Sequence, residues 1–173
     1  VQLRIQTGDK TDTRRLLLTR PHERVACPLE TPFVVVNEGG HGFYRVPYGP
    51  PLLQRLLENL ETLRPIGRFN LVNDAWASTV AGLMPLSAYL DLTGRFTAER
   101  DKNVWAVLID SLGFLNRIID PTHRPLLEAL VRTRVGPATA SVGWTPQPRE
   151  SELIGQLRSE LIGALGRLGN DSE

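Results

Sequence analysis

The first 48 residues place apolar and polar side chains in an alternation of period two, which is typical of β-strands. The alternation is clear in residues 1–5, and Gly8-Asp9 offers a turn after it. A second apolar run at residues 15–18 predicts another strand before a segment that contains several prolines. The beginning of the chain therefore predicts antiparallel β-structure.

A third predicted strand lies in the Phe-Val-Val-Val run at residues 33–36, and a fourth in the alternating residues 43–46. Gly39 and Gly40 lie between these two segments, which predicts a β-hairpin that joins them. Taken alone, the predicted strands are too few to close a β-sandwich.

From Pro50 onward the apolar residues recur at spacings of three and four, which predicts amphipathic helices. The helical stripes fall within residues 52–63, 72–83, 86–96, 104–115, 126–131 and 153–168. The sixth has Glu150 and Glu152 at its start and Gly169 just past its end, as the helix dipole and the C-cap prefer. We expect the switch from strand to helix between Pro47 and Pro51.

The breaks between the helical stripes are short and carry prolines such as Pro65, Pro85 and Pro121. Short breaks make neighbouring helices antiparallel, so the six stripes predict a helix bundle or the start of an α-solenoid. The longest stretch without periodicity, residues 136–149, is predicted to be a loop. The predicted domains are residues 1–48, mainly β, and residues 49–173, mainly α.

The composition is that of an ordinary globular protein: the 173 residues are 41% hydrophobic and 23% charged. The net charge of +1 provides no field that would hold nucleic acid or an anionic membrane, so we expect neither as a partner. No apolar run approaches the roughly 18 residues of a membrane span. Cys27 is the only cysteine, which indicates a reducing, cytoplasmic compartment. Because Val1 is not a start methionine, we expect a fragment of a longer protein.

A zinc-peptidase motif is approached but not completed. His22-Glu23 begins like H-E-x-x-H, in which both imidazoles reach one metal ion from a single helix. Ala26 stands where the second histidine is required, and the flanking pattern is not helical. A histidine in a solvated loop is the better interpretation.

Other candidate residues also lack the partners that their chemistry requires. His41 lies in a glycine-rich turn without phosphate-binding spacing, and His123 has no partner placed by a motif. Ser141 falls short of the G-x-S-x-G elbow because the first glycine is absent. Cys27 is expected to be a small buried or half-buried thiol. The remaining candidates are carboxylates that fit a solvated helix face and tryptophans that fit the core: Asp91, Glu99, Asp101, Asp110, Trp76, Trp105 and Trp144. We assign no catalytic, cofactor-binding or metal-binding residue to this chain.

Four segments, in order, resemble the aminopeptidase N family of zinc metallopeptidases. Residues 36–48 are similar to the family's V-N-x-x-x-x-G-F-Y-R-V-x-Y run, in which the β-sandwich domain passes into the helical C-terminal domain. Residues 68–75 resemble its R-x-x-L-x-D-A helix, residues 89–105 its L-x-x-E-x-D-x-x-x-W segment, and residues 143–169 its G-W, E, L-R and G helix. Residues 1–19 resemble the late strands of the sandwich more weakly.

The resemblance implies a fold and a function for the parent protein. It implies that residues 1–48 are a partial antiparallel β-sandwich and that residues 49–173 begin a superhelix of HEAT- or armadillo-like helix pairs. In the family such a region covers the active site and limits which peptides enter. Zinc and the amine-binding motif belong to a catalytic domain outside this sequence, so the chain itself is expected to be inactive and to act with that domain on peptide substrates. Tyr44 and Arg45 are expected on opposite faces of a strand, where the arginine can bind backbone carbonyls or a carboxylate.

A second interpretation shares the fold and differs in function. The chain could be a free-standing α-solenoid scaffold that binds a peptide or protein on its concave face, with no enzyme attached. The upstream reading frame discriminates between the two, because an enzyme fragment requires H-E-x-x-H and a downstream glutamate there. An independent hydrolase is poorly supported, since no nucleophile–base set is present.

Overall fold

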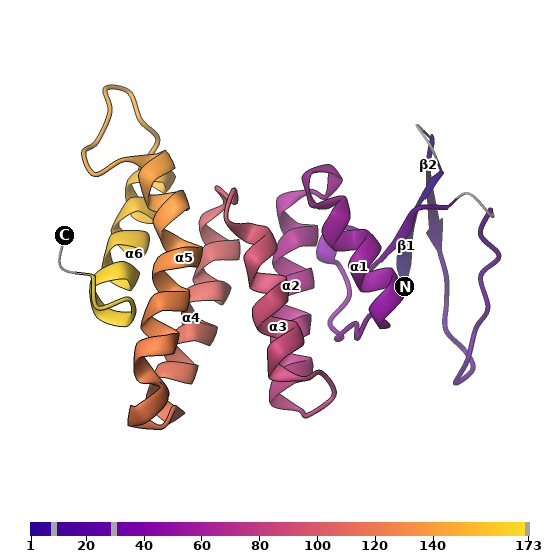
Figure 1. Ribbon diagram of the computed structural model, residues 1–173. Coiled ribbons are helices and arrows are strands. Elements are labelled where there is room, and N and C mark those ends of the chain that lie inside the picture. The colour runs from indigo at the N-terminus through magenta and orange to yellow at the C-terminus, as the bar shows by residue number, and fades with distance from the viewer. Residues whose placement is uncertain (8–9, 29–30, 172–173) are drawn as a thin grey trace. The chain divides into compact units, whose positions relative to one another are not determined.

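A computed structural model describes residues 1–7, 10–28 and 31–171 (Figure 1). The chain divides into two compact units, Val1–Met84 and Pro85–Glu173, which are treated separately below. In its described part, the first unit contains a small antiparallel sheet and two α-helices, and the second unit contains four α-helices. The chain is therefore β first and mainly α afterwards, as predicted. The domain boundary between residues 48 and 49 stays a prediction.

The sheet has three strands within the described residues: β1 (Gln2–Thr7), β2 (Lys10–Arg15) and β3 (Phe33–Val36). The strand order is β2-β1-β3, and β1 pairs antiparallel with both neighbours. Ile5 and Phe33 are buried, and their sequence neighbours are more exposed, because alternate side chains of a strand point to opposite faces. The period-two prediction is confirmed for these segments, while the turn predicted at Gly8-Asp9 lies outside the described residues.

The predicted hairpin between residues 33–36 and 43–46 is wrong. After β3 the chain enters a short 3-10 helix, η1 (Glu38–Gly40), and residues 43–46 are not a strand. Asn37 has a positive φ of 62° and Gly40 one of 69°, so the backbone leaves the extended conformation here. Gly40 also lies against Ile66, whose Cγ1 would be 2.8 Å from an added Cβ.

The strand predicted at residues 15–18 is also misplaced, because β2 ends at Arg15. Leu17 and Leu18 follow in an extended segment without secondary structure, and both side chains are exposed. Apolar side chains alone therefore did not define the end of this strand.

The first unit continues with α1 (Pro50–Glu58), a 3-10 turn η2 (Leu60–Thr62) and α2 (Pro65–Val80). The switch to helix at Pro50 falls where the periodicity predicted it. Proline suits these first helical positions because the first turn leaves its N–H groups without an intrahelical partner. Buried leucines of the first stripe, including Leu56, cover the sheet side of the unit, since α1 packs against β3.

The second unit consists of α3 (Leu86–Thr93), η3 (Gly94–Phe96), α4 (Lys102–Ile118), η4 (Pro121–His123), α5 (Arg124–Val142) and α6 (Glu152–Leu168). The core of this unit is built from the predicted stripes. Its fully buried members include Trp105, Leu108, Val131, Leu157 and Leu161. Each of the six predicted helical stripes falls mainly on a helix, but the first runs past α1 through η2 to Leu63, and the second runs past the end of α2 to Leu83.

The loop predicted at residues 136–149 is wrong in its first half, because α5 extends through Pro137 to Val142. Val135, Ala138 and Val142 are buried at helical spacing and pack within the unit, where α5 lies against α6. A proline inside a helix costs about 3 kcal/mol, and burial of several apolar side chains offsets a cost of that size. Only the segment from Gly143 to Ser151 is a loop.

Helices α5 and α6 run antiparallel. Arg132, midway along α5, donates from Nη1 to the carbonyl of Gly169 at the end of α6, and Arg158 of α6 donates from Nη2 to the carbonyl of Val142 at the end of α5. Gly169 is the C-cap of α6, as predicted, with a right-handed φ of −85°, and the left-handed residue that follows it is Asn170 with φ 50°.

Candidate functional site

The segment between β3 and α1 is held to α2 by Asp74, whose side chain is buried. Its Oδ1 accepts a hydrogen bond from Arg45 Nη1 at 3.0 Å, and its Oδ2 accepts one from the backbone N–H of Val46 at 3.1 Å. The Arg45 side chain is 56% exposed, so the ion pair is partly solvated. The backbone hydrogen bond from Val46 is the better shielded of the two interactions.

Two further side chains of the same segment bond to its own backbone. Asn37 accepts from the N–H of Gly42 at 2.7 Å through Oδ1 and donates through Nδ2 to the carbonyl of Gly42 at 3.0 Å. The Tyr48 hydroxyl accepts from the N–H of Val36 at 2.9 Å and donates to the carbonyl of Val36 at 3.2 Å. Burial raises the pKa of Tyr48 to about 12, so the hydroxyl keeps the proton that it donates.

We call Asn37, Arg45, Val46, Tyr48 and Asp74 the Asp74 cluster. Its members come from the two family-like segments, 36–48 and 68–75, and their hydrogen bonds bring these two segments together. The expectation that Arg45 binds a carboxylate is confirmed, while the strand on which it was placed is absent. Sequence reasoning did not single out Asp74 as the acceptor, although an acidic residue between the buried Val72 and Ala75 was the available signal.

In the second unit, the segment around Glu99 also bonds to itself. Glu99 is buried, and its Oε1 accepts from the N–H groups of Arg100 and Asp101, both at 2.8 Å. Asp101 caps α4 by accepting from the N–H groups of Asn103 and Val104. The buried indole of Trp105 donates to the carbonyl of Glu99 at 2.9 Å. The residues of this family-like segment thus fix the turn that precedes α4.

Glu150 and Arg158 form the corresponding contact at the start of α6. Arg158 Nη1 donates to Glu150 Oε1 at 2.6 Å, Arg158 Nη2 donates to Glu150 Oε2, and Arg158 Nε donates to the carbonyl of Gly143 at 2.8 Å. The hydrogen bonds from Arg158 hold the pKa of the Glu150 carboxyl below its ordinary range. This bidentate pair ties the 143–151 loop to the helix that follows it.

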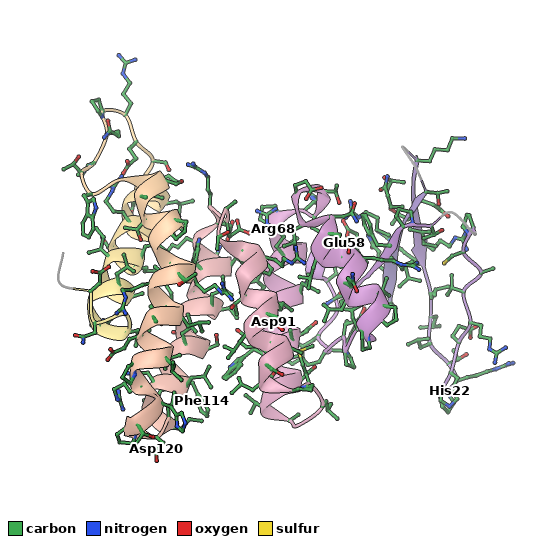
Figure 2. The ribbon with its side chains drawn as sticks, viewed as in Figure 1. His22, Glu58, Arg68, Asp91, Phe114 and Asp120 are labelled. Atoms are coloured by element: carbon green, nitrogen blue, oxygen red, sulfur yellow. The ribbon has the colours of Figure 1, made fainter. Side chains whose placement is uncertain are left out.

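The residues considered for catalysis are accessible to solvent. His22 is exposed at the tip of the extended segment between β2 and β3 (Figure 2), and His41 is exposed in its glycine-rich turn. Ser141 is exposed on the last turn of α5 and therefore does not occupy a strand–helix elbow. Cys27 is exposed, which corrects the expectation of a buried or half-buried thiol. His123 is exposed in η4, where its Nδ1 lies 3.3 Å from Thr122 Oγ1.

The carboxylates and tryptophans divide differently from the prediction. Asp91 and Asp110 are exposed on their helices, whereas Glu99 and Asp101 are turn and capping residues. Trp105 is buried and Trp76 half-buried, but Trp144 is 58% exposed, so its assignment to the core is wrong.

Within the described ranges, no group of three or more histidine, cysteine, aspartate or glutamate residues is placed to hold a metal ion. No helix in that same part of the chain is long and apolar enough to cross a membrane.

Residues 33–173 match the family model described as the ERAP1-like C-terminal domain. The chain belongs to this family. The aminopeptidase resemblance carried by the Asp74 cluster and by the two second-unit contacts is thereby confirmed. In this chain, Asp74, Glu99 and Glu150 of the family-like segments bind backbone N–H groups or an arginine and so fix turns and helix ends.

Curated relatives of this ERAP1-like domain are aminopeptidases. Aminopeptidase M1 of Arabidopsis thaliana is 29% identical over 144 residues, covering 80% of the chain and 16% of that protein. Glutamyl aminopeptidase of Rattus norvegicus is 27% identical over 143 residues, covering 79% of the chain and 15% of that protein. Aminopeptidase M1-B of Oryza sativa subsp. japonica is 29% identical over 168 residues, covering 94% and 19%. The chain therefore spans less than a fifth of the length of these relatives.

Proposed function

We propose that this chain is the non-catalytic C-terminal region of a zinc-dependent aminopeptidase, which removes N-terminal residues from peptides. In this proposal it covers the active site of a catalytic domain and limits which peptides reach it. The observation that carries the proposal is that the family-like residues are used to hold backbone segments. The carboxylates accept hydrogen bonds from backbone N–H groups or from an arginine of this chain in all three cases, Asp74, Glu99 and Glu150.

The finer fold belongs to the same proposal: the sheet is the end of a β-sandwich, and the helices begin a superhelix of helix pairs. The exposed Leu17 and Leu18 support the first part, because apolar side chains beside a small sheet suit further burial. The second unit supports the second part. There α5 is antiparallel to α6, and α4 packs against both of them.

We also propose that zinc is bound in the catalytic domain, that peptide substrates and this domain are the partners, and that the protein is cytoplasmic. The single cysteine supports the location, since Cys27 is an exposed free thiol. Conversely, the described residues offer no cluster of metal ligands.

The first test is an assay of the purified 173-residue chain with added zinc on aminoacyl-anilides. We expect no turnover. Turnover that a chelator abolishes and that survives repurification would overturn the assignment of a non-catalytic role. The full-length gene is expected to encode H-E-x-x-H and a downstream glutamate before this region. If it does not, the alternative of a free-standing scaffold for peptides or proteins takes its place.

The covering role requires the parent enzyme. Asp74→Ala loosens the Asp74 cluster, and Asp110→Ala, at an exposed position of α4, is the matched control. We expect Asp74→Ala to raise kcat/KM for long peptides relative to a dipeptide anilide, and Asp110→Ala to leave the ratio unchanged. An unchanged ratio in both variants, with the Asp74 variant shown to be locally destabilised, would contradict a role in limiting access.

A further inference from the structure

The segment between β2 and β3 is extended and exposed to solvent (Figure 1). The described residues 16–28 contain no helix or strand, and all residues from 17 to 24 are exposed. Among the described residues, the backbone groups of 17–24 make no hydrogen bond to another backbone group. An endopeptidase binds its substrate as an extended chain whose N–H and C=O groups pair with the enzyme. This segment already has that conformation, whereas a helix or a paired strand would first have to open.

One peptide bond in this segment suits cleavage after a basic residue. The segment contains two arginines, Arg20 and Arg24, and both side chains are exposed. Arg20 precedes Pro21, whose ring encloses the nitrogen that must leave and removes its N–H. Arg24 precedes Val25, which presents an ordinary peptide bond. A trypsin-type endopeptidase binds the basic side chain before the cleaved bond with an aspartate in its specificity pocket, so Arg24–Val25 is the bond that it would select.

The fold or the sequence protects the bonds that follow the other basic residues. Most of the remaining described arginines and lysines lie in helices or paired strands. Two precede a proline, namely Arg64 and Arg124. Others precede a residue whose N–H is hydrogen-bonded within the fold, namely Arg15, Arg45, Arg100 and Arg149. Arg24 therefore differs from them in the freedom of the bond that follows it.

Cleavage after Arg24 would leave the sheet in place. The first product, residues 1–24, contains β1 and β2, and β1 pairs with β3 on the other side of the cleaved bond. Ile5 of β1 is buried, and Arg4 forms an ion pair with Glu38 at 3.5 Å between Nε and Oε2. The two products therefore share a core and an ion pair, which hold them together without the covalent link.

We propose that Arg24–Val25 is a specific cleavage site for an arginine-directed serine endopeptidase, and that the cleaved chain keeps its sheet. Water adds across the bond, so the carbonyl carbon of Arg24 becomes a carboxylate and the nitrogen of Val25 becomes an α-amine. One contact restrains the site. Arg14 of β2 donates from Nη1 to the carbonyl of Ala26 at 2.8 Å and holds the chain just after the cleaved bond. Loss of this hydrogen bond should speed the cleavage.

The test treats the folded 173-residue chain with a trace of trypsin at neutral pH, and mass spectrometry identifies the first products. Wild type is compared with Arg24→Gln, Arg20→Gln and Arg14→Ala. Arg20→Gln is the matched control, because it removes the same charge from the same segment at a bond that proline protects. After trypsin is inhibited, size-exclusion chromatography shows whether the products stay together.

We expect residues 1–24 and 25–173 as the first products, and we expect them to elute together at the volume of the uncleaved chain. Arg24→Gln should slow the first cleavage by about a hundredfold or more, Arg20→Gln should not change it, and Arg14→Ala should speed it by about two- to tenfold. If Arg14→Ala is cleaved at many bonds because it has unfolded, Arg14→Gln replaces it. The proposal is overturned by a first cleavage at another bond, by equal rates in the Arg24 and Arg20 variants, by an unchanged rate in the folded Arg14 variant, or by products that separate on the column.

Discussion

Replacement of Asp74 by alanine tests whether the Asp74 cluster holds the 37–48 segment to α2. The variant removes the acceptor of the Val46 N–H and of Arg45 Nη1. A hydrogen bond to a charged group contributes about 1.5–3 kcal/mol, and a partly exposed ion pair adds about 0.2–1 kcal/mol. Because alanine has a higher helix propensity than aspartate, the substitution also stabilises α2 by about 0.5 kcal/mol. The free energy of opening this region should therefore fall by about 2–3 kcal/mol.

Two companion variants rank the interactions of the cluster. Arg45→Ala removes only the partly solvated partner, so it should cost no more than about 1 kcal/mol. Asp74→Asn keeps an acceptor for the Val46 N–H but can turn its amide donors toward Arg45, so its cost should be intermediate. The expected order of destabilisation is Asp74→Ala, then Asp74→Asn, then Arg45→Ala.

The assay is hydrogen exchange read by mass spectrometry on peptides from residues 37–48 and 65–80. A local measurement is needed because two compact units need not unfold together. Peptides from α4 to α6 provide the internal control and should not change. The reasoning is refuted if Asp74→Ala lowers the opening free energy by less than about 0.5 kcal/mol, or if Arg45→Ala costs as much as Asp74→Ala.

Two other predictions concern the second unit. Trp105→Ala should lower the free energy of unfolding by about 3–5 kcal/mol, because the indole is buried and donates a hydrogen bond to the carbonyl of Glu99. Trp144→Ala, at an exposed site, should lower it by less than about 1 kcal/mol. Denaturant melts compare the two variants, and similar losses of stability would contradict the assignment of Trp105 to the core. The pKa of Glu150 is lowered in the fold by the hydrogen bonds from Arg158, so the stability that this carboxylate contributes is fully present above its ordinary pKa of 4.5 and is lost as the pH falls through the lowered value. In thermal melts from neutral pH down to this acid range, Glu150→Gln should be less stable than wild type at neutral pH and should lose less stability on acidification; parallel pH profiles would show that the pair does not contribute.

The helices were the most predictable part of the fold, because their stripes depend on a period that every turn repeats. Trp105 and Leu108 are buried as their spacing indicated. The wrong predictions of helix and strand ends have local causes that the hydrophobic pattern does not indicate. Helix α5 continues past Pro137 because the burial of Val142 and its neighbours offsets the cost of a proline inside the helix. Asn37 adopts a positive φ, which the β-branched residues before it do not predict.

The candidate site was only partly predictable for a related reason. The family-like segments were visible in the sequence, but their hydrogen-bond partners depend on which backbone groups the fold leaves without a partner. Asp74 accepts from Val46 across 28 positions, and Glu150, in the loop before α6, binds Arg158 in the helix that follows. Trp144 was predicted to lie in the core and is exposed, because an aromatic residue in a loop has no periodic neighbours that indicate whether its side chain is buried.

The Tyr48 hydroxyl limits the addition of a further strand to the sheet at the edge formed by β3. The N–H and C=O of Val36 that it binds point away from β1, toward the side of β3 where another strand would add. An unpaired strand edge is a template for association with other chains, and proteins protect such edges by covering them. By occupying both groups, one phenol blocks strand addition at the end of β3. Any polypeptide that extended the sheet there would first have to displace this half-buried tyrosine.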